Sequence, residues 1–135
     1  MVRRRTRCRH GRIIAGEQIG RNQVAEGIPV AKVGDIEDED AIVVPRATTG
    51  TVDDIAIFRS AGEYSAIDNT CTHEDASLAE GWIENGTVEC PLHASSFCLR
   101  DGKVLGPPAP RGVVAHRVTI DGDRILLIPD PSRLA

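Results

Sequence analysis

Two short segments of the chain hold the residues best suited to chemistry. Each pairs one cysteine with one histidine: Cys71-Thr72-His73 and, after sixteen intervening residues, Cys90-Pro91-Leu92-His93. A structural zinc site usually takes like ligands from each loop, a cysteine pair followed by a histidine pair. Here each loop offers one thiolate and one imidazole. This pattern favours a centre with two unlike metal positions, one bound by both cysteines and the other by both histidines, and it indicates one-electron transfer.

The rest of the chain must position these two loops, and its composition favours short strands. The 135 residues give room for one domain, and with only four aromatic side chains the core must be built from Val, Ile, Leu and Ala. Thirteen glycines and eight prolines indicate many turns between β-branched runs, which is typical of an all-β domain. A bound metal would add to the stability of such a modest core.

Strand patterns occur on both sides of the ligand loops. Between the loops, the runs Glu80-Gly81-Trp82-Ile83 and Thr87-Val88-Glu89 flank Asn85-Gly86, a strong tight-turn signal. After them, 113–120 and 124–128 are expected to pair in a terminal hairpin. Further strands are predicted at residues 28–33, 41–44, 54–59, 64–67 and 96–99. A loop or ragged hairpin is expected at 45–53, and no long helix is expected.

Charge is divided unevenly along the chain. Residues 1–21 carry seven arginines and one glutamate, whereas residues 22–135 carry nine basic and nineteen acidic residues, and the net charge is −4. Residues 1–26 are interpreted as a basic, disordered N-terminal extension, because no aromatic residue or apolar periodicity accompanies the arginines to suggest nucleic-acid binding. The acidic body is expected to attract a partner with a basic docking surface.

The cysteines and the apolar runs of the sequence indicate the cellular compartment in which the protein works. No apolar stretch approaches the roughly 18 residues that would suggest a membrane span. No apolar run follows Arg3-Arg4-Arg5, so a secretory signal is not expected, although the acid-free start leaves a transit peptide as an alternative. Four cysteines without a secretory signal fit a reducing compartment, where thiols bind metals and do not form disulfides. The predicted location is the cytoplasm.

With these residues in view, the chain resembles the Rieske-type ferredoxins, the electron carriers of multicomponent bacterial aromatic-ring dioxygenases. The resemblance rests on the two Cys/His loops, on Ser96-Phe97 and on the later Gly106-Pro107-Pro108-Ala109-Pro110. It implies an all-β fold, a Rieske-type antiparallel β-sandwich over residues 27–130, with a small cluster-binding subdomain at about 68–110.

The resemblance also implies the site and the partners. Cys71 and Cys90 are expected to bind the inner iron of one [2Fe–2S] cluster per chain, and His73 and His93 the outer iron. The chain would carry single electrons from a flavin-dependent reductase to a terminal non-haem iron dioxygenase. It would not itself be an enzyme, and neither nucleic acid nor membrane is an expected partner. Two alternatives are the small subunit of an NAD(P)H-dependent nitrite reductase and a structural zinc-binding interaction domain.

Departures from related Rieske proteins narrow the subtype. Ala76 and Leu92 occupy the positions where respiratory Rieske proteins carry a disulfide, so that bridge is absent. Phe97 stands where those proteins have a tyrosine, which removes a hydroxyl bond to the cluster. Together these differences predict a potential in the lower, soluble-ferredoxin part of the range. A second, mononuclear iron is not expected, because only His10 and His116 remain after the cluster is assigned.

Four further features have simpler interpretations than a site. Cys8-Arg9-His10 repeats the Cys-x-His spacing by chance, since no second pair accompanies it. Cys98 is interpreted as a small strand residue and not a ligand, and His116 as a surface or hydrogen-bonded histidine. Trp82 is expected to be a partly buried packing residue, with a role as a docking anchor as the alternative.

Overall fold

The computed structural model describes residues 27–72, 75–92, 95–106 and 109–135. The predicted extension 1–26 lies outside these ranges. Within them the chain forms nine strands: β1 (Ile28–Lys32), β2 (Asp40–Val44), β3 (Ile55–Ser60), β4 (Glu63–Asp68), β5 (Trp82–Glu84), β6 (Thr87–Glu89), β7 (Ser96–Cys98), β8 (Ala115–Asp121) and β9 (Arg124–Ile128). The helical elements are short turns: α2 (Arg46–Thr49), η2 (Leu78–Glu80) and η3 (Pro131–Arg133).

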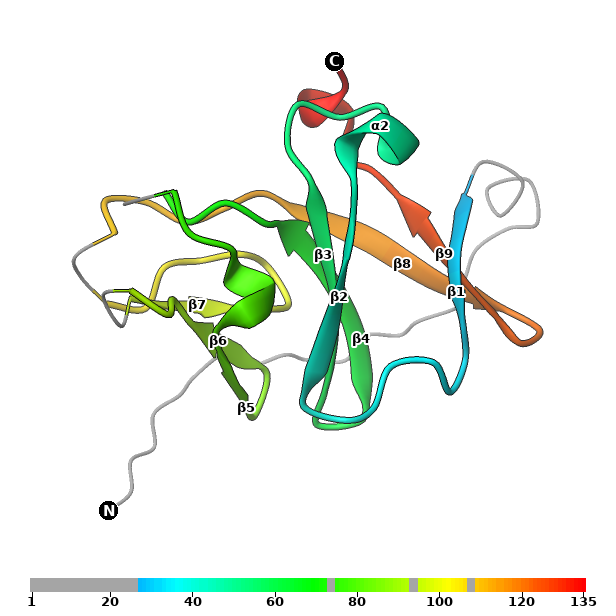
Figure 1. The fold of residues 1–135 in the computed structure, drawn as a ribbon, viewed down its shortest axis with the longest axis horizontal. Helices are drawn as coiled ribbons and strands as arrows, with labels where there is room; N and C mark the ends of the chain where they lie inside the picture. The colour runs from blue at the N-terminus through cyan, green and yellow to red at the C-terminus, as the bar shows by residue number, and fades with distance from the viewer. Residues whose placement is uncertain (1–26, 73–74, 93–94, 107–108) are drawn as a thin grey trace.

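Six strands form the base of the molecule, an antiparallel sheet in the order β1-β9-β8-β4-β3-β2. The sheet curls so that its two halves pack face to face (Figure 1). One core fills the space between the halves: Ile55 and Ile57 of β3 pack in the same cluster as Ile125 and Leu127 of β9. The predicted antiparallel β-sandwich is therefore confirmed for this part of the chain.

The second sheet is small and has the order β5-β6-β7. Figure 1 shows it beside the base, joined to it by long connections. The predicted hairpin turn is present, with positive φ at Asn85 (48°) and Gly86 (79°), as the primed two-residue turns require. Ile83 pairs with Val88, and Val88 pairs with Phe97. These three side chains face inward, towards the base.

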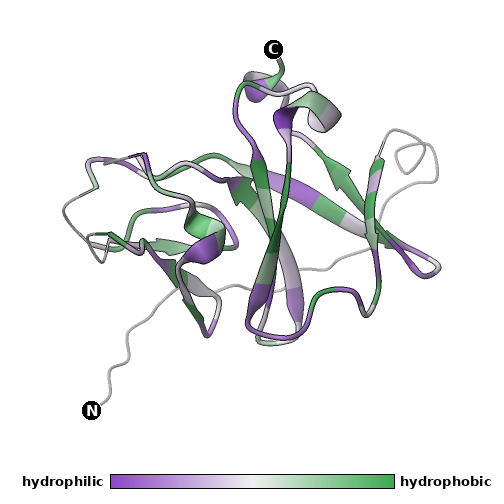
Figure 2. Cartoon of the chain, viewed as in Figure 1, coloured by the Kyte–Doolittle hydropathy of each residue, from purple (hydrophilic) through white to green (hydrophobic). Residues whose placement is uncertain are grey.

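Strand β3 joins the two parts because both of its faces are buried. Ile55 and Ile57 face the core of the base, whereas Ala56 and Phe58 alternate with them and pack with residues of the small sheet. Such a strand is expected to be continuously apolar. Figure 2 shows β3 as hydrophobic along most of its length, with hydrophilic hairpin ends around it.

The predicted strands are confirmed, with shifts of one or two residues at their ends. The expected loop at 45–53 differs, because residues Arg46–Thr49 form one helical turn that ends at Gly50 in the left-handed region. Pro45 precedes this turn, and the Asp54 carboxylate accepts the backbone N–H of Arg46 at 2.9 Å. No helix within the described residues is long and apolar enough to cross a membrane.

Candidate metal centre

The two ligand loops are closed by the same backbone hydrogen bond. The N–H of Cys71 donates to the carbonyl of Ala76 at 3.0 Å, and the N–H of Cys90 donates to the carbonyl of Ser95 at 2.7 Å. Each bond spans five residues and places a cysteine at the start of a reversed loop. The similarity that the sequence showed in residue type therefore extends to the backbone.

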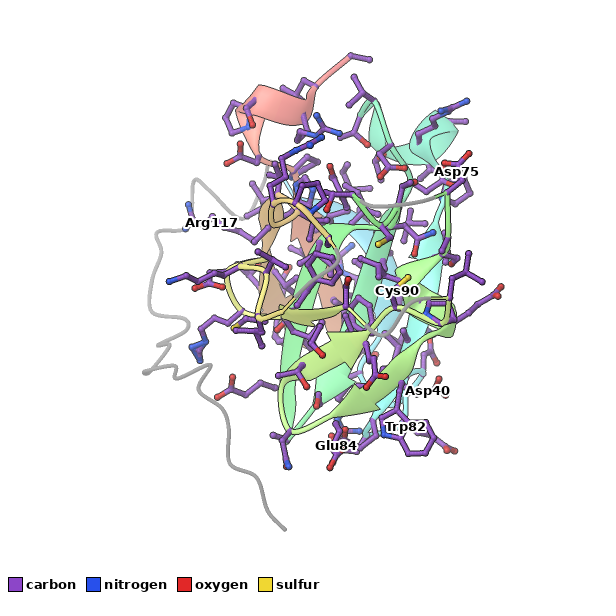
Figure 3. All side chains as sticks on the ribbon, turned by 90° about the vertical axis from the view of Figure 1, so that its left-hand side faces the viewer. Asp40, Asp75, Trp82, Glu84, Cys90 and Arg117 are labelled. Atoms are coloured by element: carbon purple, nitrogen blue, oxygen red, sulfur yellow. The ribbon has the colours of Figure 1, made fainter. Side chains whose placement is uncertain are left out.

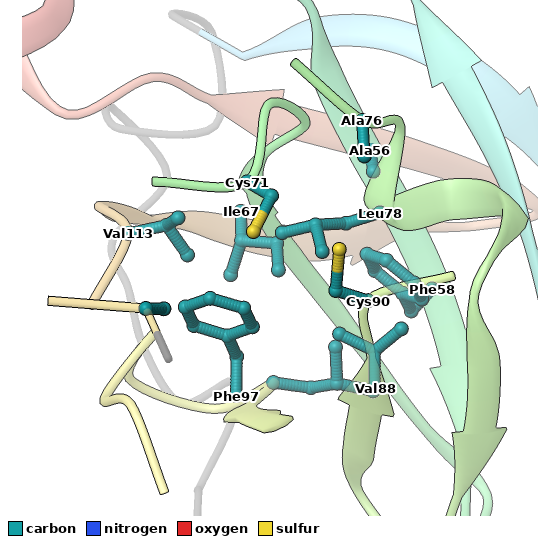
Figure 4. Close-up of a cluster of buried hydrophobic side chains, with 12 residues drawn as sticks. Ala56, Phe58, Ile67, Cys71, Ala76, Leu78, Val88, Cys90, Phe97 and Val113 are labelled. Atoms are coloured by element: carbon teal, nitrogen blue, oxygen red, sulfur yellow. The ribbon is translucent and has the colours of Figure 1, made fainter. Parts of the chain in front are cut away.

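The two cysteines lie side by side in the interior. Cys71 is 3% exposed and Cys90 is 2% exposed, and neither forms a disulfide. Figure 4 shows their sulfur atoms in one apolar space, with Ile67, Leu78 and Phe97 around them. Two buried sulfurs brought together without a disulfide can act as a pair of thiolate ligands for one metal ion.

Polar contacts fix the base of the first loop. The carboxylate of Asp53 accepts the backbone N–H of Thr70 at 3.0 Å and its hydroxyl at 2.8 Å. The Asn69 side chain accepts the N–H of Ala79 at 3.0 Å and donates to the Ser77 hydroxyl at 3.0 Å. These bonds tie the residues immediately before Cys71 to η2 and to the segment that leads into β3. Sequence analysis missed them, although the polar run Asp68-Asn69-Thr70 ahead of Cys71 was an available signal.

A third segment contacts both ligand loops. The Thr72 hydroxyl donates to the carbonyl of Arg111 at 2.6 Å, and the buried Ser95 hydroxyl accepts the N–H of Ala109 at 2.8 Å. This segment includes Ala109 of the proline-rich stretch that the sequence indicated, and it continues to Arg111 directly after that stretch. Two of its own residues, Pro107 and Pro108, lie outside the described residues. The contacts at Ala109 and Arg111 hold the segment against the loops that carry the cysteines.

A close backbone approach sets the end of this segment. Gly102 has φ of 76°, and a Cβ built on it would lie 1.9 Å from the carbonyl oxygen of Val113. The N–H of Val113 donates to the carbonyl of Gly102 at 2.8 Å. Only glycine fits such a contact, so this residue allows the chain to return beside the small sheet.

The two predicted histidine ligands, His73 and His93, lie outside the described residues. Each follows directly on a described loop residue, Thr72 and Leu92. Leu92 is 57% exposed, so the second loop reaches the surface immediately before its histidine. Within the part of the chain that the structure describes, no group of three or more His, Cys, Asp and Glu side chains is placed to hold a metal ion.

His116 is a buried, hydrogen-bonded residue, as the sequence suggested. Its Nδ1 accepts the backbone N–H of Asp130 at 2.8 Å, so the proton lies on Nε2, which donates to Asp68 at 2.8 Å. The other oxygen of Asp68 lies 2.7 Å from Nε of Arg133. These contacts satisfy the imidazole within the base sheet.

Two expectations about single residues require correction. Cys98, on β7, is disulfide-bonded, and its partner is not among the described residues. The expectation that the cysteines serve metals and not disulfides is therefore wrong for Cys98. Trp82 was expected to be partly buried, but it is 70% exposed. Its neighbour Ile83 takes the inward position on the strand, so the alternation of β5 turns the indole outward.

The donor set fits a Rieske centre at its cysteine end. Such a centre needs one thiolate from each of two loops on the same iron and an apolar wall behind them. Cys71 and Cys90 supply this arrangement, and the hydrogen bonds of the loops fix it. Backbone and hydroxyl groups around a cluster, such as those of Ser95, are the kind of donors that adjust its potential.

Comparisons with known proteins agree with this geometry. Residues 26–129 match the family described as Rieske [2Fe-2S] domain. A curated relative, the 3-phenylpropionate/cinnamic acid dioxygenase ferredoxin subunit of Shigella boydii serotype 4, is 42% identical over 96 residues, which are 70% of this chain and 86% of the relative. The ferredoxin of carbazole 1,9a-dioxygenase from Nocardioides aromaticivorans IC177 is similar with a TM-score of 0.70 and 28% identity, covering 77% of this chain and 98% of that one.

A third similar structure is a complex of reduced oxygenase and oxidized ferredoxin in carbazole 1,9a-dioxygenase. It has a TM-score of 0.70 and 23% identity, and it covers 76% of this chain and 93% of the matched chain. At this identity the likeness shows the fold alone.

The chain belongs to the Rieske [2Fe-2S] domain family. Its relatives are ferredoxin subunits of dioxygenases, which carry electrons and are not the catalytic components. The protein is accordingly a Rieske-type ferredoxin, and the fold class and family inferred from its sequence are confirmed.

Proposed function

We propose that this ferredoxin carries single electrons from a flavin-dependent reductase to a terminal non-haem iron oxygenase that acts on aromatic rings. The dioxygenase ferredoxin relatives at 42% identity support this role. The observation that carries it is the pair of buried cysteines, Cys71 and Cys90, at the start of two loops closed in the same way.

We assign one cluster to each chain, with Cys71 and Cys90 on the inner iron and His73 and His93 on the outer iron. The cysteine positions support the first half of this assignment. The second half is supported by the sequence, because each histidine follows its cysteine within the same short loop. We place the whole domain at residues 27–130 and its cluster-binding subdomain at about 68–110, in keeping with the family match over residues 26–129.

When bound, a Rieske cluster supplies reversible uptake of one electron, and two neutral imidazoles in place of two thiolates make this uptake more favourable. The chain's own residues exclude water from the cysteine side, where Ile67, Leu78 and Phe97 form the wall. The closing bonds at Cys71 and Cys90 hold the two loops in place during the change of charge. Because Leu92 lies at the surface, a docked partner can contact the second loop at the residue directly before its histidine.

We propose the cytoplasm as the location. The disulfide at Cys98 removes cysteine usage as an argument for a reducing compartment. The proposal depends instead on the electron source, since the reductases that serve such systems draw electrons from NAD(P)H, a cytoplasmic reductant. Fractionation of cells followed by detection of this chain tests the location directly.

The direct test of the function is reconstitution. Iron-replete protein is mixed with NADH, a flavin-dependent reductase and a terminal aromatic-ring oxygenase, and both the oxidation of NADH and the formation of ring-oxidised product are followed. The proposal predicts that product forms only when the ferredoxin is present and that it forms in proportion to the ferredoxin when this component is limiting.

Two further measurements separate the alternatives. A protein that supports nitrite reduction by the catalytic subunit of an NAD(P)H-dependent nitrite reductase, but no ring oxidation, would be the small subunit of that enzyme. Metal analysis that finds stoichiometric zinc without iron or sulfide would indicate a structural zinc domain and would overturn the proposal.

A further inference from the structure

Trp82 is the large apolar side chain most exposed to solvent among the described residues, at 70%. It is the only tryptophan in the chain, and it lies on β5 of the small sheet. Figure 3 shows it projecting at the lower end of this sheet, with Cys90 further up on the side that faces the viewer. An exposed indole loses much contact with water when a partner covers it, and tryptophan is enriched among the residues that dominate binding energy.

The indole belongs to a sheet face that nothing among the described residues covers. Ile83 and Val88 form the inward pair of the β5–β6 hairpin, so the side chains next to them point outward. Trp82 and Glu89 form one outward pair, and Glu84 lies on the same side of β5. The indole Nε1–H donates to the Glu84 carboxylate at 3.2 Å. This bond holds the ring in one orientation, so less conformational entropy is lost on binding.

The charged side chains of the hairpin and of η2 before it are all acidic. No lysine or arginine occurs between Arg59 and Arg100, a stretch that contains seven acidic residues. Glu80, Glu84 and Glu89 are all exposed beside Trp82, and none of them forms a salt bridge with another described residue. A partner that fits this face must bring positive charge around an apolar recess.

The face also adjoins the metal centre. Glu89 is the outward partner of Trp82 and immediately precedes Cys90 along the chain. A protein that covers the whole outward face, from Trp82 to Glu89, therefore reaches the residue directly before the second ligand loop, in which Leu92 is exposed.

We propose that the outward face of the β5–β6 hairpin, with Trp82 at its centre and Glu80, Glu84 and Glu89 around it, is the docking surface for the terminal oxygenase. The partner site is an apolar recess rimmed by lysine and arginine side chains. This inference rests on the proposed function. The oxygenase is the chosen occupant because one of the similar structures is a complex of reduced oxygenase and oxidized ferredoxin, whereas no similar structure described above contains a reductase. The carboxylates speed the encounter, and the indole supplies specificity.

The test uses the reconstituted system, in which each protein–protein step has its own KM for ferredoxin. Trp82→Ala is expected to raise the KM of the oxygenase for ferredoxin about 10-fold or more, with kcat at saturating ferredoxin unchanged. The KM of the reductase for ferredoxin, the reduction potential and the paramagnetic spectrum should stay the same. Trp82→Phe should recover part of the lost affinity. Ile120→Ala is the matched control, since Ile120 is also exposed (47%) but lies on β8 in the base sheet, and it should change nothing.

Charge is tested separately by Glu84→Gln/Glu89→Gln. This double variant should lower the association rate several-fold at low salt and flatten its dependence on ionic strength. Asp121→Asn/Asp123→Asn removes the same charge from the β8–β9 hairpin at the opposite end of Figure 1 and should leave both unchanged.

Three results would overturn the proposal. Trp82→Ala could match Ile120→Ala at the oxygenase, it could impair the reductase step instead, or it could alter the spectrum of the cluster and so act on the fold of the small sheet. Failure of the wild-type chain to pass electrons to an oxygenase is a different result, because it contradicts the proposed function itself.

Discussion

The base sheet and the small sheet differ in what stabilises them. The strands of the base have five to seven residues, and their core consists of aliphatic side chains such as Ile57 and Leu127. The strands of the small sheet have three residues each, and the core beside it includes Cys71 and Cys90. A sheet this short is marginal by itself, and thiolates that hold a metal stabilise the folded state. The comparison indicates that apolar burial forms the base, whereas the bound cluster completes the small sheet.

Substitution of a ligand cysteine should have the largest effect, and it should affect the cluster and not the base sheet. Cys71→Ala removes one of two thiolates from the inner iron, so we expect complete loss of the cluster while the base sheet remains folded. Iron and acid-labile sulfide analysis measures the first effect, and circular dichroism measures the second. Cys98→Ser is the matched control and should retain iron and sulfide. Retention of a full cluster in Cys71→Ala would remove Cys71 from the ligand set.

The converse change lies in the base. Ile57 lies on β3, is fully buried and packs in the same cluster as residues of β9. Ile57→Ala should lower the free energy of unfolding by about 2–5 kcal/mol. The reduction potential should not move, because the substitution lies on the face of β3 away from the cysteines. Denaturant titration and redox titration measure the two quantities. Ile120→Ala, at an exposed site, should change stability by no more than about 0.5 kcal/mol. A shifted potential in Ile57→Ala would show that the two regions are not separable.

Substitution of a ligand histidine tests whether the reduction potential depends on the small sheet's side of the molecule. His73→Cys replaces a neutral ligand with an anionic one, so the cluster should be harder to reduce. We expect a potential lower by roughly 100 mV or more, or no assembled cluster. Protein-film voltammetry gives the potential. His10→Gln should leave it unchanged, since His10 has no role in the assigned site. A potential that also stays constant in His73→Cys would exclude His73 as a ligand.

A smaller effect is expected at the support of the first loop. Asn69→Ala removes the acceptor of the Ala79 N–H and both contacts with Ser77, and it leaves the partly buried N–H of Ala79 unsatisfied. The free energy of unfolding should fall by about 1–3 kcal/mol, and loss of iron to a chelator should become faster. Thr87→Ala, which deletes an exposed hydrogen bond to Glu84 in the same sheet, should have little effect. Equal iron loss in the two variants would contradict the role of Asn69 in holding the loop.

The smallest effect concerns pH and the end of the chain. The Ser132 hydroxyl, followed by the Ser132 backbone N–H, donates to the carboxylate of Asp130 and holds its pKa below the ordinary value of 3.8. The folded state thus binds this proton less readily than the unfolded state. The stabilisation is present above the unfolded pKa and is lost as the pH falls through the folded one. Stability measured below pH 4 should decline less steeply in Asp130→Asn, and an identical acid limb would contradict this contribution.

The sequence was most informative where local pattern alone decides structure. Residue types at fixed spacing predicted the Asn85-Gly86 turn, the terminal hairpin and the two similar loops that begin at Cys71 and Cys90. Other features depend on contacts between distant segments. The Arg46–Thr49 turn is held by Asp54, and the Thr72 contact with Arg111 joins residues far apart in the chain. The sequence of one segment does not predict which distant residue it will contact.

Trp82 illustrates a different limit. An isolated Gly81-Trp82-Ile83 run does not say which of its two large side chains faces the core. The register with Val88 and Glu89 decides this, and it turns the indole outward. The prediction failed because burial is a property of the pairing and not of the residue type.

The most direct measurement of the central claim is the pulsed paramagnetic resonance spectrum of the iron-replete protein after one-electron reduction. A cluster held by sulfur at one iron and by His73 and His93 at the other predicts a rhombic signal that is coupled to two histidine nitrogens. A reduced protein that gives no signal, or a signal without nitrogen coupling, would contradict the account.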